Sequence, residues 1–230
     1  MPAYPIVSSA PLTLSPSTEG RVYGLFGLAI GLTLLGVWLG IQYMELLLGS
    51  GVLLMLLLVE LGIVFTSGLW SRRSPLNYLL FGLFPVLSGL TLTPYLLAVV
   101  AGYVNGSAIL LNALAATAFM AGAAAVVALT SGWNLSVLGR SLFFALLGLI
   151  GLGILQVFVP SFRTGQFELL LSGAGVALFA VFTAYDIQRI AALSRTGANP
   201  FQLALSLYLD IYNLFLYVVR FMLALSGRRD

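Results

Sequence analysis

Seven stretches of this sequence are long enough and apolar enough to cross a membrane as helices. A spanning helix needs about 20 mostly apolar residues, and short turn-rich links such as Ser71–Pro75 and Thr196–Pro200 separate the stretches. Apolar runs of this length without period-two alternation are not the strands of a membrane barrel. The sequence therefore predicts an all-α integral membrane protein, a seven-transmembrane-helix bundle with spans at Val22–Tyr43, Leu47–Trp70, Leu76–Tyr103, Ser107–Ser131, Leu138–Val159, Phe167–Ala192 and Phe201–Leu225.

Composition argues against most soluble and catalytic classes. Hydrophobic residues make up 60% of the 230-residue chain and charged residues 7%, whereas a soluble domain carries about 25% charged residues. Cysteine and histidine are absent, which excludes disulfides, zinc sites built on thiolate or imidazole, and Ser-His-Asp catalysis. An intramembrane aspartyl protease would need a Gly-x-Gly-Asp motif, and Asp186 follows Ala184 and Tyr185 instead. We expect neither an enzyme nor a tightly bound cofactor, and the scattered arginines argue against nucleic acid as a partner.

Residues outside the spans predict the domain limits and the orientation. Residues 1–20 are rich in Pro, Ser and Thr and are expected to form a mobile tail, which leaves residues 21–226 as the membrane domain. Because arginine favours the cytoplasmic side of a membrane, the side with more arginines, which includes the amino terminus, is predicted to be cytoplasmic. That side holds Arg21, Arg72, Arg73, Arg140, Arg189 and Arg195, and the other side holds Arg163, Arg228 and Arg229.

Three acidic residues lie well inside the predicted spans, away from their ends, where a charge is expensive. An ionised side chain near the bilayer centre costs at least about 2.5 kcal/mol, so it needs a partner, a cavity or a proton. Glu60 is in the second span, Asp186 is near the end of the sixth, and Asp210 is in the first half of the seventh. Because the sixth and seventh spans form a hairpin with a short link, both aspartates fall in the same half of the membrane and can meet.

A polar stripe runs along the seventh span. Its members follow one another at alternating spacings of about four and three residues, which places them on one helical face. Such a stripe belongs inside a bundle or beside water, and interhelical hydrogen bonding is the simplest role for most of it. The stripe consists of Ser206, Asp210, Asn213, Tyr217 and Arg220.

The sixth and seventh spans carry the most specific motifs. Leu205–Phe215 has the sequence LSLYLDIYNLF and Ala184–Ile190 has the sequence AYDIQRI, with their aspartates 24 residues apart. Both segments resemble the signatures of the transmembrane Bax inhibitor motif family (Bax inhibitor one-like), and the resemblance extends over Arg21–Leu225. It implies a bundle in which span 7 is central and six helices surround it. The short chain resembles a bacterial member, which would reside in the cytoplasmic (inner) membrane.

The resemblance also implies a function. Family members are associated with calcium leak across membranes, controlled by pH through an aspartate pair between spans 6 and 7. Carried over to this sequence, Asp186 and Asp210 would be the pH sensor and Glu60 would be a pore acid. Either Arg72 or Arg73 would be the cation that latches Glu60 in a closed form.

The chemistry of these residues suits a site for protons and calcium and leaves other functions open. Two carboxylates forced together in an apolar site cannot both ionise cheaply, so we expect Asp186 and Asp210 to share a proton, with oxygens about 2.5–3.0 Å apart. Ca²⁺ takes about six to eight oxygen ligands, and Asp186, Asp210 and Glu60 could hold it weakly and transiently. The expected partners are the lipid bilayer, Ca²⁺ and H⁺, with room for an unknown membrane protein. A proton-coupled transporter and a non-conducting partner that modulates a protease or channel are the alternatives.

Overall fold

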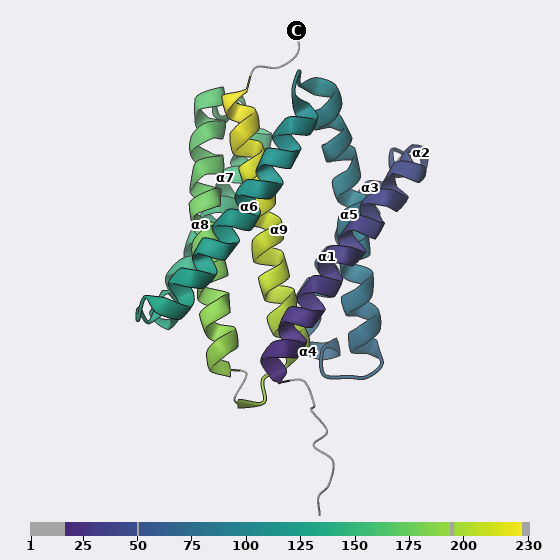
Figure 1. Ribbon diagram of the computed structural model, residues 1–230. Helices are drawn as coiled ribbons and strands as arrows, with labels where there is room; N and C mark the ends of the chain where they lie inside the picture. The colour runs from purple at the N-terminus through teal and green to yellow at the C-terminus, as the bar shows by residue number, and fades with distance from the viewer. Residues whose placement is uncertain (1–16, 50, 194–195, 227–230) are drawn as a thin grey trace, which may run out of the picture.

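The computed structural model describes residues 17–49, 51–193 and 196–226, and all secondary structure within them is helical (Figure 1). The predicted tail lies mostly outside these residues. Six helices of the described part are long and apolar enough to span a membrane, which confirms an all-helical integral membrane protein. They are α1 (Thr18–Gln42), α5 (Leu76–Gly102), α6 (Gly106–Thr130), α7 (Gly139–Phe158, preceded by the short 3₁₀ helix η1, Leu135–Leu138), α8 (Gly165–Leu193) and α9 (Pro200–Leu225).

The second predicted span, Leu47–Trp70, is interrupted. Its residues are divided among α2 (Met44–Leu47), α3 (Val52–Phe65) and α4 (Ser67–Trp70). Gly51 precedes α3 with a φ of 87°, a left-handed conformation that side chains with a Cβ rarely adopt. Helix α3 ends where the Thr66 hydroxyl donates to the Gly62 carbonyl oxygen. Its 14 residues rise about 21 Å, which is less than the roughly 30 Å hydrocarbon core. The described residues thus form six spanning helices and one shorter apolar helix, where the sequence predicted seven spans.

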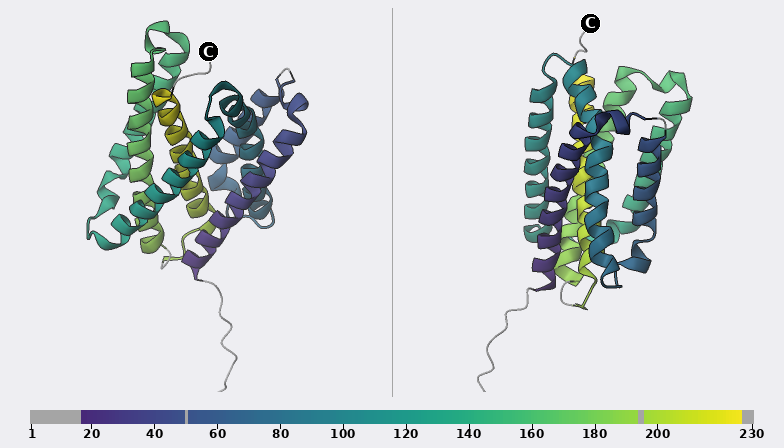
Figure 2. Two further views of the ribbon diagram at one scale, coloured as in Figure 1. Left: turned by 45° about the horizontal axis from the view of Figure 1, so that its top comes forward. Right: turned by 90° about the vertical axis from the view of Figure 1, so that its right-hand side faces the viewer.

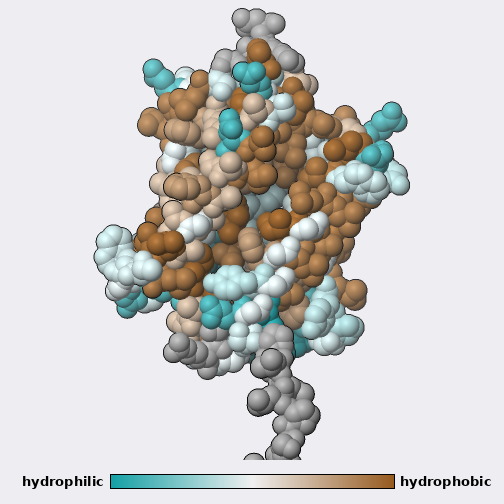
Figure 3. Space-filling view, in the orientation of Figure 1, coloured by the Kyte–Doolittle hydropathy of each residue, from teal (hydrophilic) through white to brown (hydrophobic). Residues whose placement is uncertain are grey.

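Apolar side chains cover the middle of the molecule, and hydrophilic residues gather toward its two ends (Figure 3). The aromatic side chains of Phe65, Phe119 and Phe158 are 80%, 78% and 77% exposed on the outside of the helices. Burying such a side chain away from water is worth about 1.5–3 kcal/mol, so a belt of them would be unstable in water. The belt is the surface that contacts lipid.

Helices α1 and α5 approach each other closely at glycines. A Cβ added to Gly36 would lie 2.2 Å from the Val86 carbonyl oxygen, and one added to Gly89 would lie 2.2 Å from the Thr33 carbonyl oxygen. Small residues at such points allow helix backbones to touch in a membrane, where packing rather than the hydrophobic effect holds helices together. By contrast, a Cβ on Gly31 of α1 would meet no atom within 4 Å.

The α1–α5 contact predicts opposite effects for two glycine substitutions. Gly89→Ala should lower stability by about 1–3 kcal/mol, because the new methyl group meets backbone atoms that cannot rotate away. Gly31→Ala should be neutral or stabilising by about 0.5–1 kcal/mol, because it adds helix propensity without a clash. Thermal unfolding of both variants in the same detergent checks the pair, and equal melting temperatures would show that α1 and α5 do not pack this closely.

Helices α8 and α9 form an antiparallel hairpin, and α9 also packs against α1, α5 and α6 (Figures 1 and 2). The helix begins at Pro200, and the Asn199 side chain caps it by accepting a hydrogen bond from the Phe201 amide at 2.9 Å. Asn and Pro at these positions are typical helix-start residues, so the sequence itself determines where α9 leaves the link. The Thr33 and Tyr208 hydroxyls, 2.8 Å apart, join α1 to α9.

Two buried apolar clusters lie along α9. The first cluster includes Leu207 and Tyr208, together with residues of α1, α5, α6 and α8. The second includes Leu214 and Val218, together with residues nearer the other end of the bundle. Asp210 lies on α9 between these clusters. Its carboxyl group is therefore placed inside the bundle by apolar packing above and below it.

Candidate functional site

Asp186 of α8 and Asp210 of α9 are both buried, with 3% and 7% of their surface exposed, and their carboxyl groups lie beside each other. Asp186 Oδ1 is 3.5 Å from Arg189 Nη1, and the Ser206 side chain is also next to Asp186. Within the described chain, Oδ2 of each aspartate is buried without a hydrogen-bond partner. The structure thus brings together the two acids that the sequence paired, while the hydrogen bond between them stays a prediction.

The Asp186 end of α8 is connected to the surface by its neighbours. Arg189 has 43% of its side chain exposed and lines a surface hollow of about 670 Å³. Gln188 fastens the link between α6 and η1 to α8: its Oε1 accepts from the Leu135 amide and its Nε2 donates to the Trp133 carbonyl oxygen, both at 2.7 Å. Arg189 follows Asp186 at the i,i+3 spacing that lets helical side chains pair. The sequence therefore already contained the signal for this ion pair.

Glu60 of α3 faces α5 and is held by two hydroxyl groups. Thr91 donates to Glu60 Oε1 at 2.8 Å, and Ser88 donates to Glu60 Oε2 at 3.0 Å. Glu60 and Thr91 also line a cavity of about 410 Å³ between α3, α5 and α9, whose wall includes Asn213, Tyr217 and Arg220. The cavity places the Glu60 carboxylate and most of the far half of the polar stripe around one space.

The Thr91–Glu60 hydrogen bond joins α5 to α3, so we expect it to contribute to the stability of the bundle. Thr91→Val should lower stability by about 1 kcal/mol, because a half-buried carboxylate loses one of its two hydroxyl donors. Thr130→Val is the matched control, since the exposed Thr130 hydroxyl donates only to Val126 O of its own helix. A melting temperature lower by roughly 2–4 °C for the first variant alone is expected, measured in detergent. An equal shift in both would mean that the effect comes from the change of side chain and not from Glu60.

Arg72 and Arg73 do not pair with Glu60 in this structure. Both are exposed in the turn after α4, and the ion pairs of the described residues are Asp186–Arg189 and Glu168–Arg220. Glu60 is twelve positions before the nearer arginine, about 18 Å along a helix, and this separation is longer than an arginine side chain. A latch between them would require α3 or the turn to move.

The other members of the predicted stripe face protein in different ways. Asn213 is half-buried and donates to the Leu209 carbonyl oxygen of its own helix at 2.8 Å. The Tyr217 ring stacks on Phe179 of α8, with centroids 5.6 Å apart. It also lies against Gly175, where an added Cβ would meet the ring at 2.2 Å. Asn213 and Tyr217 therefore lie on the side of α9 that faces α8 and the cavity.

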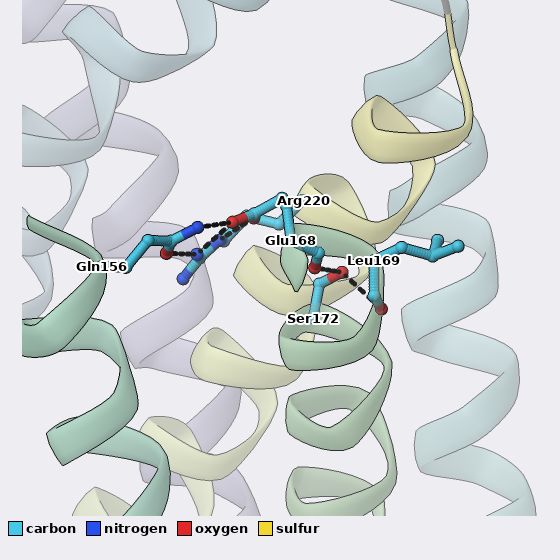
Figure 4. A network of polar contacts seen from close by, with 5 residues as sticks. All are labelled: Gln156, Glu168, Leu169, Ser172 and Arg220. Atoms are coloured by element: carbon cyan, nitrogen blue, oxygen red, sulfur yellow. Dashed lines mark hydrogen bonds and ion pairs between the residues drawn. The ribbon is translucent and has the colours of Figure 1, made fainter. Parts of the chain in front are cut away.

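Arg220 has partners that sequence reasoning missed (Figure 4). Its Nε and Nη2 donate to Glu168 Oε1 and Oε2 at 2.8 and 2.9 Å, and Nη2 also donates to Gln156 Oε1 at 3.2 Å. Gln156 Nε2 completes the network by donating to Glu168 Oε2 at 2.6 Å. The signal was present in the sequence, because Glu168 lies at the start of the predicted sixth span and Arg220 is a cation inside the seventh. Their helices form a hairpin, which brings the far ends of both together.

The structure corrects the expectation of one calcium site made by Asp186, Asp210 and Glu60. In the described residues, no three or more Asp, Glu, His or Cys side chains are grouped closely enough to hold a metal ion together. Glu60 contacts hydroxyls of α5, whereas the aspartates meet between α8 and α9. The reason is that α3 packs on α5, away from the α8–α9 contact. Any calcium ligands are thus divided between separate places.

Comparison with known proteins identifies the family. The family model described as "Inhibitor of apoptosis-promoting Bax1" matches residues 17–228. The chain belongs to this Bax inhibitor family. The match includes both segments that carry the resemblance, Ala184–Ile190 with Asp186 and Leu205–Phe215 with Asp210.

Similar proteins occur in bacteria and in a virus. An uncharacterized protein of Campylobacter jejuni is 30% identical over 210 residues, which cover 90% of this chain and 88% of the relative. The inner membrane protein YbhL of Escherichia coli K12 is 28% identical over 218 residues, covering 87% of this chain and 88% of the relative. The Golgi anti-apoptotic protein of vaccinia virus is 32% identical over 234 residues, covering 97% and 91%. The similarity thus includes nearly the whole membrane domain.

Proposed function

We propose that this member of the Bax inhibitor family is a pH-sensitive calcium leak channel, with Asp186 and Asp210 as its proton-responsive pair. The observation that carries the proposal is the pair of buried Oδ2 atoms without hydrogen-bond partners in the described chain. A carboxylate cannot donate, but a protonated one can. A single proton held between these two acids would give both groups a partner and remove one charge from the apolar interior.

The proton links α8 to α9. At low pH the shared proton bridges the two helices. At higher pH both acids ionise, and two like charges in an apolar site repel each other. Arg189 compensates one charge through Asp186, so the second charge drives the separation of the helices or the arrival of a cation. The equilibrium between two arrangements of the α8–α9 hairpin then depends on pH, as a switch requires.

The cavity that Glu60 lines supports a path for the ion. A leak needs weak, separate sites, because a cage with six to eight ligands would retain Ca²⁺. The Glu60 carboxylate already accepts two hydrogen bonds, so its remaining lone pairs and the cavity of about 410 Å³ offer a weak site. Glu60 acts as the pore acid, and Arg72 or Arg73 latches it in another closed arrangement.

The topology that fits this function has seven crossings, with α3 and α4 together as the second and α9 at the centre. The amino terminus is in the cytoplasm of a bacterium and the protein is in its inner membrane, as the name of the E. coli relative says of that protein. The Asp186–Asp210 pair is then in the cytoplasmic half. Arg195, Arg228 and Arg229, which contributed to the predicted orientation, lie outside the described residues. The protein acts with the bilayer, Ca²⁺ and H⁺ and performs no catalysis.

Removal of either titrating group should flatten the response to pH. In liposomes that contain only this protein, Asp186→Asn and Asp210→Asn should each abolish most of the pH dependence of Ca²⁺ flux while the protein stays folded. The double substitution should add little, because the two acids act as one unit. Glu45→Gln is the control, since Glu45 is an exposed acid of α2. Wild-type pH profiles in the single aspartate variants would contradict the sensor.

The latch predicts an effect on the basal leak. Replacing both Arg72 and Arg73 by Ala should raise Ca²⁺ flux at every pH, because Glu60 would lose its closing partner. The control is Arg140→Ala, which removes an exposed charge elsewhere. An unchanged leak in the double variant would leave the two arginines as signals of orientation alone.

The same liposome measurement separates the alternative functions. A proton-coupled transporter would show Ca²⁺ or solute movement that a proton gradient drives uphill, whereas a leak only dissipates gradients. A non-conducting partner of another membrane protein would show no ion flux in pure liposomes. Flux of Ca²⁺ compared with K⁺ and H⁺ across pH therefore tests the proposal directly.

A further inference from the structure

A polar network joins three helices toward the end of the bundle opposite the α8–α9 link (Figure 4). Arg220 of α9 makes a two-pronged ion pair with Glu168 of α8, and Gln156 of α7 bonds to both of them. The guanidinium also lies over the Tyr217 ring, 5.3 Å from its centre. Bidentate pairs of this kind fix orientation as well as charge. Arg220 is therefore held in one position by four side-chain contacts.

The network separates two hollows. On one side is the hollow of about 410 Å³ between α3, α5 and α9, lined by Glu60, Tyr95 and Arg220. On the other is a surface hollow of about 560 Å³, lined by Gln156, Glu168 and Arg163. Arg220 faces the first hollow and its partners face the second, so the ion pair spans the boundary. The guanidinium thus lies between the Glu60 hollow and the hollow at the end of the bundle.

We propose that Arg220 is a tethered cation that closes this boundary, and that Glu168 and Gln156 form the cation site that it occupies. The inference rests on the proposed function and adds a second closure, at the opposite end of the α8–α9 hairpin from the aspartate pair. Divalent cations compete with the guanidinium for the same oxygens, and passage requires that Arg220 leave them.

The ligand atoms suit a hard cation. Glu168 contributes two carboxylate oxygens and Gln156 contributes its amide oxygen, all of which Arg220 or Gln156 nitrogen atoms now contact. Calcium binds such carboxylate and amide oxygens, with water completing the shell. Three protein oxygens make a weak site, which is what a conducting path needs. The positive charge of Arg220 itself repels a second cation as long as it stays in place.

A resting position for the displaced guanidinium is present in the same cavity. The Tyr95 hydroxyl lines it and is buried without a hydrogen-bond partner in the described part of the chain. A phenol oxygen accepts hydrogen bonds from guanidinium, and the Tyr217 ring offers a face to the cation in either position. The unpaired hydroxyl is unexplained by packing alone, and a second position of Arg220 would use it.

Accessibility of a cavity residue tests the closure without relying on ion flux. The chain has no cysteine, so Leu216→Cys, which places a thiol in the hollow that Glu60 lines, one turn before Arg220, gives a single label site. Proteoliposomes are treated with a membrane-impermeant, positively charged methanethiosulfonate. Rates are normalised to Ser161→Cys, an exposed position at the same end. All variants are made in the Leu216→Cys protein. Adding Arg220→Gln should raise the labelling rate of Cys at position 216 at least tenfold, and adding Arg220→Lys should raise it by less. The control substitution Arg140→Gln should leave the rate unchanged.

A charge swap distinguishes closure from loss of structure. Glu168→Arg combined with Arg220→Glu restores an ion pair and should return labelling to the slow rate. Fast labelling that the swap does not reverse would overturn the proposal, and so would unchanged slow labelling of a folded Arg220→Gln. Ca²⁺ flux in the same vesicles separates the two proposals. If Arg220→Gln accelerates labelling and the charge swap reverses this, but no variant conducts Ca²⁺, the leak channel is rejected and the closure is kept. If Ca²⁺ flux depends on pH but neither the flux nor the labelling rate changes when Arg220 is replaced, the closure is rejected and the channel is kept.

Discussion

The cost of an unpaired polar group in hydrocarbon organises this structure. Each such group costs several kcal/mol when no water or partner satisfies it. Glu60, Asp186 and Glu168 accordingly have partners within the bundle. The exceptions in the described chain are few: Ser71 Oγ, Tyr95 Oη, and Oδ2 of Asp186 and of Asp210 are buried without a hydrogen bond. For the two aspartates a shared proton, and for Tyr95 a moving Arg220 side chain, would supply the missing partner in the states proposed above; Ser71 has no such account.

Helix α9 collects most of these polar contacts and connects them. Along its length Tyr208 meets Thr33 of α1 at 2.8 Å, Tyr212 donates to the Ser88 carbonyl of α5 at 3.1 Å, and Arg220 meets Glu168 of α8. Each interhelical hydrogen bond in a membrane contributes only about 0.6 kcal/mol, so their main effect is to fix the register of α9 against its neighbours. Together these contacts fix α9 in one alignment with α1, α5 and α8.

Much of this arrangement was readable in the sequence, and the failures have physical causes. Apolar run length identified the helices, and the cost of membrane acids singled out Asp186 and Asp210. Hydropathy could not predict the division of the second span, because the breaks at Gly51 and Thr66 hardly change the hydropathy of the run. The partner of Arg220 depends on which turns of α8 and α9 face each other, a register that periodicity within one helix cannot determine.

The residues that can respond to pH are restricted by what the chain lacks. It has no histidine and no cysteine, the groups that ordinarily change charge near neutrality. Each of its ten cations is arginine, whose guanidinium stays charged at any physiological pH. The ion pair at Arg220 therefore cannot open by losing a proton from the cation, and only an acid can supply the titration. Among the acids within the helices, Asp186 and Asp210 are the two most buried and lie side by side, which is why the proposed proton response is placed at the α8–α9 contact.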